Sequence, residues 1–418
     1  MLLNKAMTPT RRTFFHTLAG AAALPRFASA LAASTGDDGY WQAVRRQFAF
    51  AEDKVPMNAA NLCPSPRAVG ERVAELTRDI DADCSFQNRA KFAQLTEDAR
   101  AKVAEMMGVS ADEIALVRNT SESNNIINNG LPLAAGDEVV IWEQNHPTNN
   151  VAWDVRARRF GIVVKRVKTP ADPQSVDDLI EPFRKALGPK TKVLSLTHAS
   201  NTTGVKLPVQ QLIEIGHAKG LHVHVDGAQS WGALHVNLRE LGCDSYSASG
   251  HKWFVGPKEV GLLYVKASKI DKIWPVEVAP GWGDTADTVL VGARKLESMG
   301  QRDDAALAGV GATADFHKTT GGARIEQHMV SLAQRLKEGL AEAGVKLTTP
   351  MKPELSAGVC IMEVPAANRQ ALMDGLYLEH GIAGSTAGGL RLCPHMYNTT
   401  EHVDRAVAGV KALRKYWS

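Results

Sequence analysis

The sequence predicts an α/β protein, with a large domain on a mostly parallel, doubly wound sheet and a smaller C-terminal α+β domain. Short apolar runs alternate with amphipathic helical stretches between residues 114 and 265, a pattern typical of parallel sheets. Beyond residue 311 the alternation gives way to helices with few strands. The 418 residues are enough for two domains, each with its own core.

Each predicted element follows from its hydrophobic period. The predicted strands are Ile114–Val117, Glu138–Trp142, Ile162–Val167, Val193–Thr197, Leu221–Val225, Ser245–Ala248 and Val260–Val265. Helices are predicted at Leu95–Met107, Ser175–Leu187 and Val209–Lys219. The C-terminal part is predicted to hold helices at 323–343, 367–379 and 401–415 and a strand at 359–364.

We expect four segments: a signal peptide over 1–33, an N-terminal segment over 34–59, a large domain over 60–310 and a small domain over 311–418. The net charge is +3, but the first 34 residues hold four basic residues and no acid, which leaves 3 − 4 = −1 elsewhere. This balance gives no indication of nucleic-acid binding. The five cysteines are scattered without a C-x-x-C pair, so neither a zinc site nor a disulfide scaffold is predicted.

The N-terminus has the features of an export signal. Arg11 and Arg12 precede a weakly apolar stretch over 18–24, and Ala-Ser-Ala at 28–30 has the pattern of a cleavage site. The apolar stretch is far shorter than the roughly 20 residues that span a bilayer. This arrangement resembles a twin-arginine signal, which the export machinery reads, and it predicts a periplasmic protein without a stable membrane span. A disordered tail is the alternative.

Polar residues follow four of the predicted strands, where ligands bind in such sheets. Thr120 and Ser121 open a helix and could cradle a phosphate, although helix capping uses the same residues. His146 could lie over a planar ligand or be incidental. Asn201 lies in a polar turn, and Asp226 could serve a ligand or cap a helix.

Lys252 lies between His251 and Trp253, directly after Ser249-Gly250. Most lysines are solvated, but these neighbours could desolvate the amine and make it reactive. An amine for a Schiff base, a carboxylate for a pyridinium nitrogen, a ring and a phosphate cup are what pyridoxal phosphate (PLP) requires. The combination therefore predicts a PLP enzyme.

The stretches HVDGAQ at 224–229 and SGHK at 249–252, followed by GP at 256–257 and GLLY at 261–264, resemble the class V aminotransferases. These enzymes belong to the fold-type I PLP group, and the resemblance spans about residues 58 to 399. It implies that the lysine forms the aldimine and then acts as base at the substrate's α carbon. The implied cofactor residues are Lys252, Asp226 on the pyridinium, Gln229 and Asn201 at the phenolic oxygen, His146 on the ring, and Thr120, Ser121, Ser249 and His251 at the phosphate.

The resemblance also implies a substrate site and a homodimer. Arg391 would bind the carboxylate of a small, amino-acid-like substrate. Gln301 would approach the phosphate in the second subunit, although relatives usually have threonine there. The segments 297–303 and 58–62 look like the isopenicillin N epimerase branch, and Asn61 is a further candidate for substrate binding.

The segment 383–389 lacks the nucleophilic cysteine of the family's desulfurases, which argues against a persulfide route. Cys393 lies beyond the arginine and is expected to be a packed thiol. A C–S lyase without a cysteine nucleophile stays open beside aminotransferase or epimerase chemistry. An exported relative in this branch modifies pyoverdine, so the resemblance makes the tailoring of a secreted metabolite a reasonable expectation.

Alternatives from other classes have weaker support. Ser249-x-x-Lys252 fits one motif of penicillin-recognising serine enzymes, but S-D-N is missing and residues 318–321 only approach K-T-G. Gly309-Val310-Gly311 follows a helical stretch instead of a strand, which argues against a dinucleotide site. An exported binding protein without catalysis would need only a pocket, and unlike a PLP enzyme it would be colourless.

Overall fold

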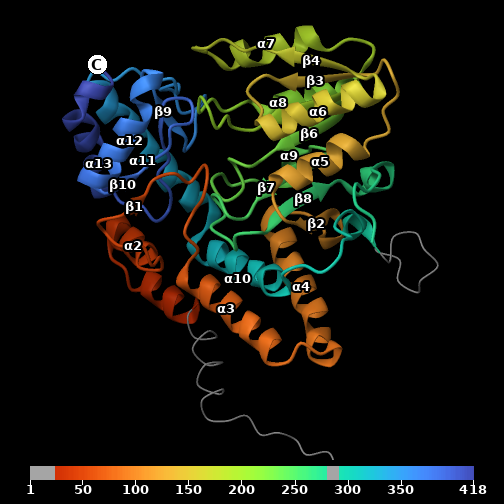
Figure 1. The fold of residues 1–418 in the computed structure, drawn as a ribbon, viewed down its shortest axis with the longest axis horizontal. Helices are drawn as coiled ribbons and strands as arrows, with labels where there is room; N and C mark the ends of the chain where they lie inside the picture. The colour runs from red at the N-terminus through yellow and green to blue at the C-terminus, as the bar shows by residue number, and fades with distance from the viewer. Residues whose placement is uncertain (1–23, 280–290) are drawn as a thin grey trace, which may run out of the picture.

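The computed structural model describes residues 24–279 and 291–418. Its centre is a seven-stranded sheet in the order β2-β8-β7-β6-β5-β3-β4 (Figure 1). The strands are β2 Ile114–Val117, β3 Glu138–Trp142, β4 Val163–Val167, β5 Thr191–Thr197, β6 His222–Asp226, β7 Ser245–Ser249 and β8 Gly261–Val265. Strand β8 is antiparallel to both of its neighbours, and the other pairs are parallel. The predicted mostly parallel sheet is therefore confirmed.

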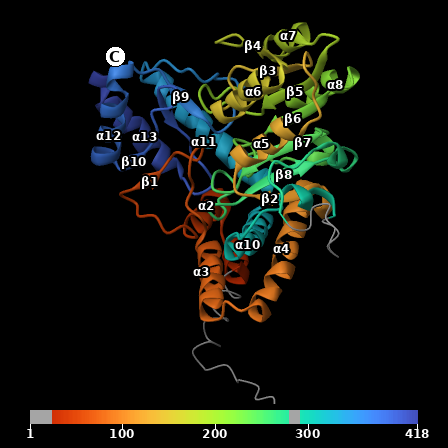
Figure 2. The same cartoon turned by 45° about the vertical axis from the view of Figure 1, so that its right-hand side comes forward.

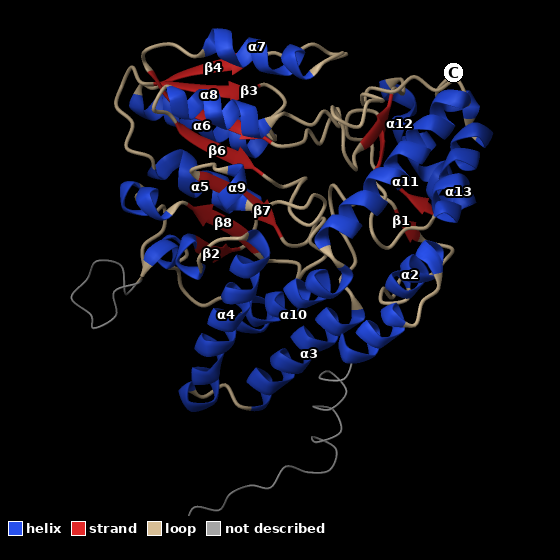
Figure 3. Ribbon diagram, turned by 180° about the vertical axis from the view of Figure 1, so that it is seen from behind, coloured by secondary structure: helices blue, strands red, loops and turns tan. Residues whose placement is uncertain are grey.

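Helices cover both faces of the sheet, as expected from strands such as β2, β3 and β8 whose side chains are apolar on both faces (Figure 3). In β3, Val140 and Trp142 pack with α4 (Phe86–Met107), α7 (Val176–Ala186) and α8 (Val209–Ala218). Val139 and Ile141 point to the other face and pack with α5 (Thr120–Gly130) and α6 (Pro147–Phe160). Helix α9 (Leu238–Leu241) adds one short turn before β7.

Three helices lie side by side below the sheet (Figure 2). Helix α10 (Asp304–Thr320) packs along both α3 (Arg67–Ala82) and α4. The predicted boundary at 310–311 falls inside α10. The helix runs unbroken through Gly309 and Gly311, so these glycines do not form a phosphate-binding loop.

The C-terminal part is the predicted α+β arrangement. Helices α11 (Gly322–Glu342), α12 (Arg369–His380) and α13 (Thr400–Ala412) pack against β9 and β11 through a shared apolar cluster. β9 (Cys360–Met362) and β11 (Leu390–Leu392) are antiparallel. β1 (Val55–Pro56) pairs with β10 (Ile382–Ala383), so the chain after α2 (Gly36–Arg45) joins this part although it is far away in sequence.

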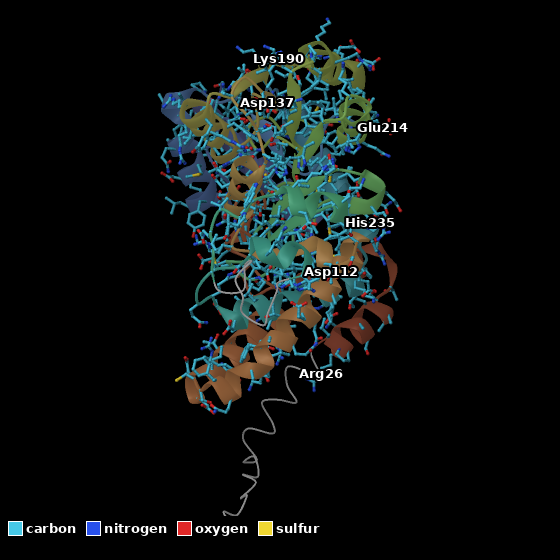
Figure 4. All side chains as sticks on the ribbon, turned by 90° about the vertical axis from the view of Figure 1, so that its right-hand side faces the viewer. Arg26, Asp112, Asp137, Lys190, Glu214 and His235 are labelled. Carbon is cyan, nitrogen blue, oxygen red and sulfur yellow. The ribbon has the colours of Figure 1, made fainter. Side chains whose placement is uncertain are left out.

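The N-terminal end of the described chain packs on the protein. Residues 24–32 form a helix, and Arg26 projects from its exposed side (Figure 4). Phe27 is buried and stacks on Phe316 of α10, with ring centroids 4.9 Å apart. The arginine pair at 11–12 lies outside the described residues. Among the described helices, none is long and apolar enough to cross a membrane.

Candidate active site

A cavity of about 160 Å³ opens where β5, β6 and β7 end. This is the edge at which doubly wound sheets bind their ligands. The strand ends and following loops bring together nine of the residues predicted to hold a cofactor. They are Thr120, Ser121, His146, Asn201, Asp226, Gln229, Ser249, His251 and Lys252.

Lys252 is held in a tight loop directly after β7. Its carbonyl accepts a hydrogen bond from Val255 N at 2.9 Å, and Gly256 N donates to Gly250 O at 2.7 Å. Val255 has φ 54°, a strained conformation for a β-branched residue, which indicates a loop fixed by its surroundings. Burial lowers the pKa of Lys252, Asp226 opposes this change, and Arg391 adds to it. An amine with a lowered pKa is a better nucleophile near neutral pH.

Asp226 is buried at the end of β6, and its carboxylate accepts two hydrogen bonds. Asn124 Nδ2 donates to Oδ2 at 2.8 Å, and Ala228 N donates to Oδ1 at 3.0 Å. The turn is tight, because a Cβ at Gly227 would lie 1.9 Å from the Tyr246 ring. Only glycine fits there, so the carboxylate is rigidly placed facing the cavity.

Asn124 is itself oriented by a buried histidine. Burial lowers the pKa of His224 to about 3, so this imidazole is neutral. Ser245 Oγ lies 2.8 Å from Nδ1, and Nε2 lies 2.9 Å from Asn124 Oδ1, which can only accept. Nε2 therefore donates, and the chain Ser245–His224–Asn124–Asp226 has one consistent direction. Asn124 was not predicted as a site residue, because its burial one turn inside α5 is visible only in the structure.

The N-terminus of α5 forms the opposite end of the cavity. Asn119 caps the helix by accepting from Glu122 N at 3.1 Å. Thr120 contacts Ser249 twice, through its amide at 2.9 Å and its hydroxyl at 2.6 Å. A helix N-terminus presents free N–H groups and a positive dipole, so this end suits a phosphate. The Ser249 hydroxyl is therefore hydrogen-bonded to Thr120, whereas the nucleophilic hydroxyl of a serine enzyme is hydrogen-bonded to a base.

His146 is the N-cap of α6 and lies in the wall of the cavity. Its Nδ1 accepts from Thr148 N at 3.3 Å, which leaves Nε2 as the protonated nitrogen of a neutral ring. Burial, with a smaller contribution from Lys252, lowers the pKa of His146. A neutral imidazole can lie against a planar, electron-poor ligand without charge repulsion.

Arg391 reaches the site from β11. Its guanidinium donates to Asn201 O at 2.9 Å and to Asn58 Oδ1 at 3.0 Å, and it is 4% exposed. Asn61 is exposed and does not line the cavity. Gln301 does not line this chain's cavity either. Its Oε1 accepts a hydrogen bond from the Arg89 guanidinium at 2.6 Å.

Buried polar atoms without partners show what the cavity can take. Among the described residues, Thr197 Oγ1 and His251 Nδ1 have no hydrogen-bond partner, and both residues line the cavity. Arg391 Nε is similarly unpaired within the described chain. Such atoms are costly to bury unpaired, so they favour a polar ligand with several acceptors. A phosphorylated pyridine with an acidic oxygen fits this set.

The model of the family described as "Aminotransferase class-V" matches residues 63–406, which is most of the chain. The chain belongs to the class V aminotransferase family. Class V aminotransferase relatives use PLP, and this chain is a PLP-dependent enzyme of the family.

Several relatives and structures are similar over nearly their whole length. Isopenicillin N epimerase of Amycolatopsis lactamdurans is 29% identical, covering 90% of this chain and 99% of the relative. A cysteine desulfurase of Yersinia pestis is 30% identical, covering 86% and 93%. Apo cysteine desulfurase from Thermococcus onnurineus superimposes with a TM-score of 0.81 at 23% identity, covering 91% and 99%. The structure of the cystine C–S lyase C-DES with cysteine persulfide gives 0.79 at 23% identity, covering 86% and 98%.

The cysteines of this class V protein are all free thiols, and none lines the cavity. Cys63, Cys243, Cys360 and Cys393 are buried, and Cys84 is exposed. Burial raises the pKa of Cys63 to about 12 and raises that of Cys393. Thiols with raised pKa values are poor nucleophiles.

Proposed function

We propose that the protein acts at the α carbon of an amino acid or an amino-acid moiety, by transamination or epimerisation. The observation that carries the proposal is that Lys252 and Asp226 line one cavity, while Arg391 is hydrogen-bonded to Asn201 in the wall of that cavity. Arg391 is close enough to Lys252 to lower its pKa, so a carboxylate held by the guanidinium would have its α carbon near the amine.

The protein's groups divide the work. Bound PLP supplies an electron sink for the carbanion. Asp226, oriented by its hydrogen bond from Asn124, would keep the proton on the ring nitrogen. Lys252 Nζ takes the proton from the α carbon as a general base, because burial has lowered its pKa. Arg391 orients the substrate through its carboxylate, and His146 packs on the ring.

A second candidate is a PLP-dependent C–S lyase that needs no cysteine nucleophile. The cavity without a thiol supports it, and so does the fold shared with a cystine C–S lyase. The same base at the α carbon would serve, with the thiolate leaving from the β carbon. The absence of a cysteine from the described cavity speaks against the persulfide route of the desulfurases.

Proton exchange with D₂O separates these reactions from binding alone. The purified protein, loaded with PLP, should exchange the α proton of at least one member of a panel of amino acids, as followed by NMR. Epimerisation yields the other enantiomer, transamination yields a keto acid, and lyase activity on cystine yields cysteine persulfide, pyruvate and ammonia. Failure of every substrate to exchange would contradict α-carbon chemistry.

We also propose that the protein is exported by the twin-arginine route to the periplasm and tailors a secreted metabolite. The arginine pair at 11–12 and the alanines at 28 and 30 support this proposal. Cell fractionation with Arg11→Lys/Arg12→Lys as the control should find the wild type in the periplasm and the variant in the cytoplasm.

The protein is further proposed to be a homodimer in which Gln301 faces the partner's phosphate site. Its segment is held in place, because Glu297 pairs with buried Arg100 at 2.6 Å. Sedimentation should give twice the monomer mass, and a monomer that binds PLP with full affinity would contradict the shared site.

A further inference from the structure

The amide of Gln229 has only one possible orientation in the buried wall of the cavity. Trp253 Nε1 donates to Gln229 Oε1 at 2.7 Å, and Gln229 Nε2 donates to Ala60 O at 3.1 Å. An indole N–H can only donate and a carbonyl can only accept, so both neighbours demand the same assignment of the amide. Gln229 is 3% exposed, so water does not compete for these contacts.

Trp253 is itself held in place by burial, by a hydrogen bond to its carbonyl and by contacts to its ring. It is fully buried, its carbonyl accepts from His395 Nε2 at 2.6 Å, and its ring meets the His395 ring edge-on at 5.2 Å. A Cβ at Gly358 would lie 2.6 Å from the indole, so the backbone closes directly over the ring. Trp253 also follows Lys252 in sequence, which links the lysine loop to the amide.

We propose that Trp253 is a positioning residue, which fixes Gln229 so that it presents an N–H and not a carbonyl to the phenolic oxygen of the cofactor. One hydrogen of Gln229 Nε2 is used by Ala60, and the second is left for a ligand in the cavity that Gln229 lines. Without the indole N–H, the single hydrogen bond to Ala60 O is left to hold the amide, which can then turn away from the phenolic oxygen or place Oε1 against it. This inference rests on PLP binding and adds a residue to the cofactor machinery.

The orientation has a consequence for the proton on Lys252 Nζ when the lysine is linked to the cofactor. Loss of that proton leaves more uncompensated negative charge on the phenolic oxygen, and an N–H donor stabilises this charge. The donor therefore lowers the pH at which the proton leaves. Removing this donor should raise the pH at which the proton leaves. Placing Gln229 Oε1 against the phenolic oxygen should raise that pH as well.

The test is a pH titration of the visible absorption band of the PLP-loaded protein. Trp253→Phe should raise the midpoint by about one pH unit, the size expected for one hydrogen bond. Trp231→Phe is the matched control, since Trp231 is also buried and stacks on Phe254 at 3.9 Å. Among the described residues Trp231 Nε1 has no hydrogen-bond partner, so the Trp231→Phe variant should titrate with the same midpoint as the wild type.

A double-mutant cycle separates positioning from packing. Gln229→Leu should shift the midpoint by a similar amount, and Trp253→Phe should add nothing in that background. An unchanged midpoint in Trp253→Phe, or equal shifts in both tryptophan variants, would overturn the proposal. If Trp253→Phe does not fold, 3-benzothienylalanine at 253 keeps the ring shape without the N–H and must give the same shift. A wild type without any band would instead refute PLP binding.

Discussion

At the residue scale, a chain of buried polar contacts behind the cavity decides how the cofactor would be held. Asn124 connects neutral His224 to Asp226, and its two atoms have fixed roles, because Oδ1 can only accept and Nδ2 can only donate. Hydrogen bonds to a charged carboxylate are about twice as strong as neutral ones. Asn124 therefore supports the carboxylate without touching the cofactor.

Asn124→Leu should weaken PLP binding about tenfold or more, because it removes the donor to Asp226 and leaves His224 Nε2 only its longer contact with Ser247 Oγ at 3.4 Å. The dissociation constant can be measured by titrating PLP into the apo protein and following the absorption band. Asn129→Leu is the control on the same helix, because its side chain is exposed and donates to Asn125 O at 3.0 Å. Equal affinity in the two variants would refute the role of Asn124.

At the element scale, the helix over residues 24–32 belongs to the folded structure, since it contributes Phe27 and Leu31 to an apolar cluster. This helix overlaps the Ala-Ser-Ala pattern at 28–30. Cleavage after Ala30 would remove Phe27 and expose Phe316 of α10. The mature N-terminus therefore affects stability as well as location.

Phe27→Ala should lower the free energy of unfolding by about 3 kcal/mol, as expected when a buried phenylalanine is truncated. Urea unfolding of the chain beginning at residue 24, with and without the substitution, measures this change in the free energy of unfolding. Phe86→Ala provides a matched control, because Phe86 is 86% exposed and its loss should change little. A Phe27→Ala variant as stable as Phe86→Ala would show that the helix is not docked in solution.

The elements were predictable where the hydrophobic period was long and regular. The bounds of β2 and β3 agree with the prediction at both ends, and the remaining strands of the sheet differ by one or two residues at one end or, in β6, by one residue at both ends. The predicted strand at 359–364 was too long, because β9 pairs with β11 over only three residues. The pairing of β1 with β10 and the link from Trp253 to Gln229 connect distant segments, and no local pattern signals such contacts.

At the scale of the whole molecule, buried neutral histidines make stability depend on pH. Burial lowers the pKa of His198, His222, His317 and His328 to about 4, and of His224 and His395 to about 3. The unfolded chain has the ordinary value of about 6.5, so between about pH 6.5 and 4 it binds more protons than the folded protein. Stability is therefore complete above this window and is lost as the pH falls.

The midpoint of thermal unfolding of the apo protein should fall steadily from pH 7 to pH 5. Each histidine can contribute up to about 1.4 kcal/mol per pH unit within the window. Calorimetry at several pH values and constant ionic strength measures the change. A midpoint that stays constant between pH 7 and 5 would show that these histidines are not buried as neutral rings.

The most direct test of the whole account is the absorption spectrum of the purified protein with PLP. We compare the wild type with Lys252→Ala and with Lys258→Ala, a nearby lysine whose Nζ is occupied by Cys63 O at 2.7 Å and Ser65 Oγ at 3.1 Å. The wild type and Lys258→Ala should be yellow. Borohydride should remove the yellow band and leave the cofactor bound to the denatured protein, and mass spectrometry should locate it on residue 252. Lys252→Ala should hold no covalent cofactor. Attachment at another lysine, or a colourless wild type that gains no band with PLP, would contradict the assignment of Lys252.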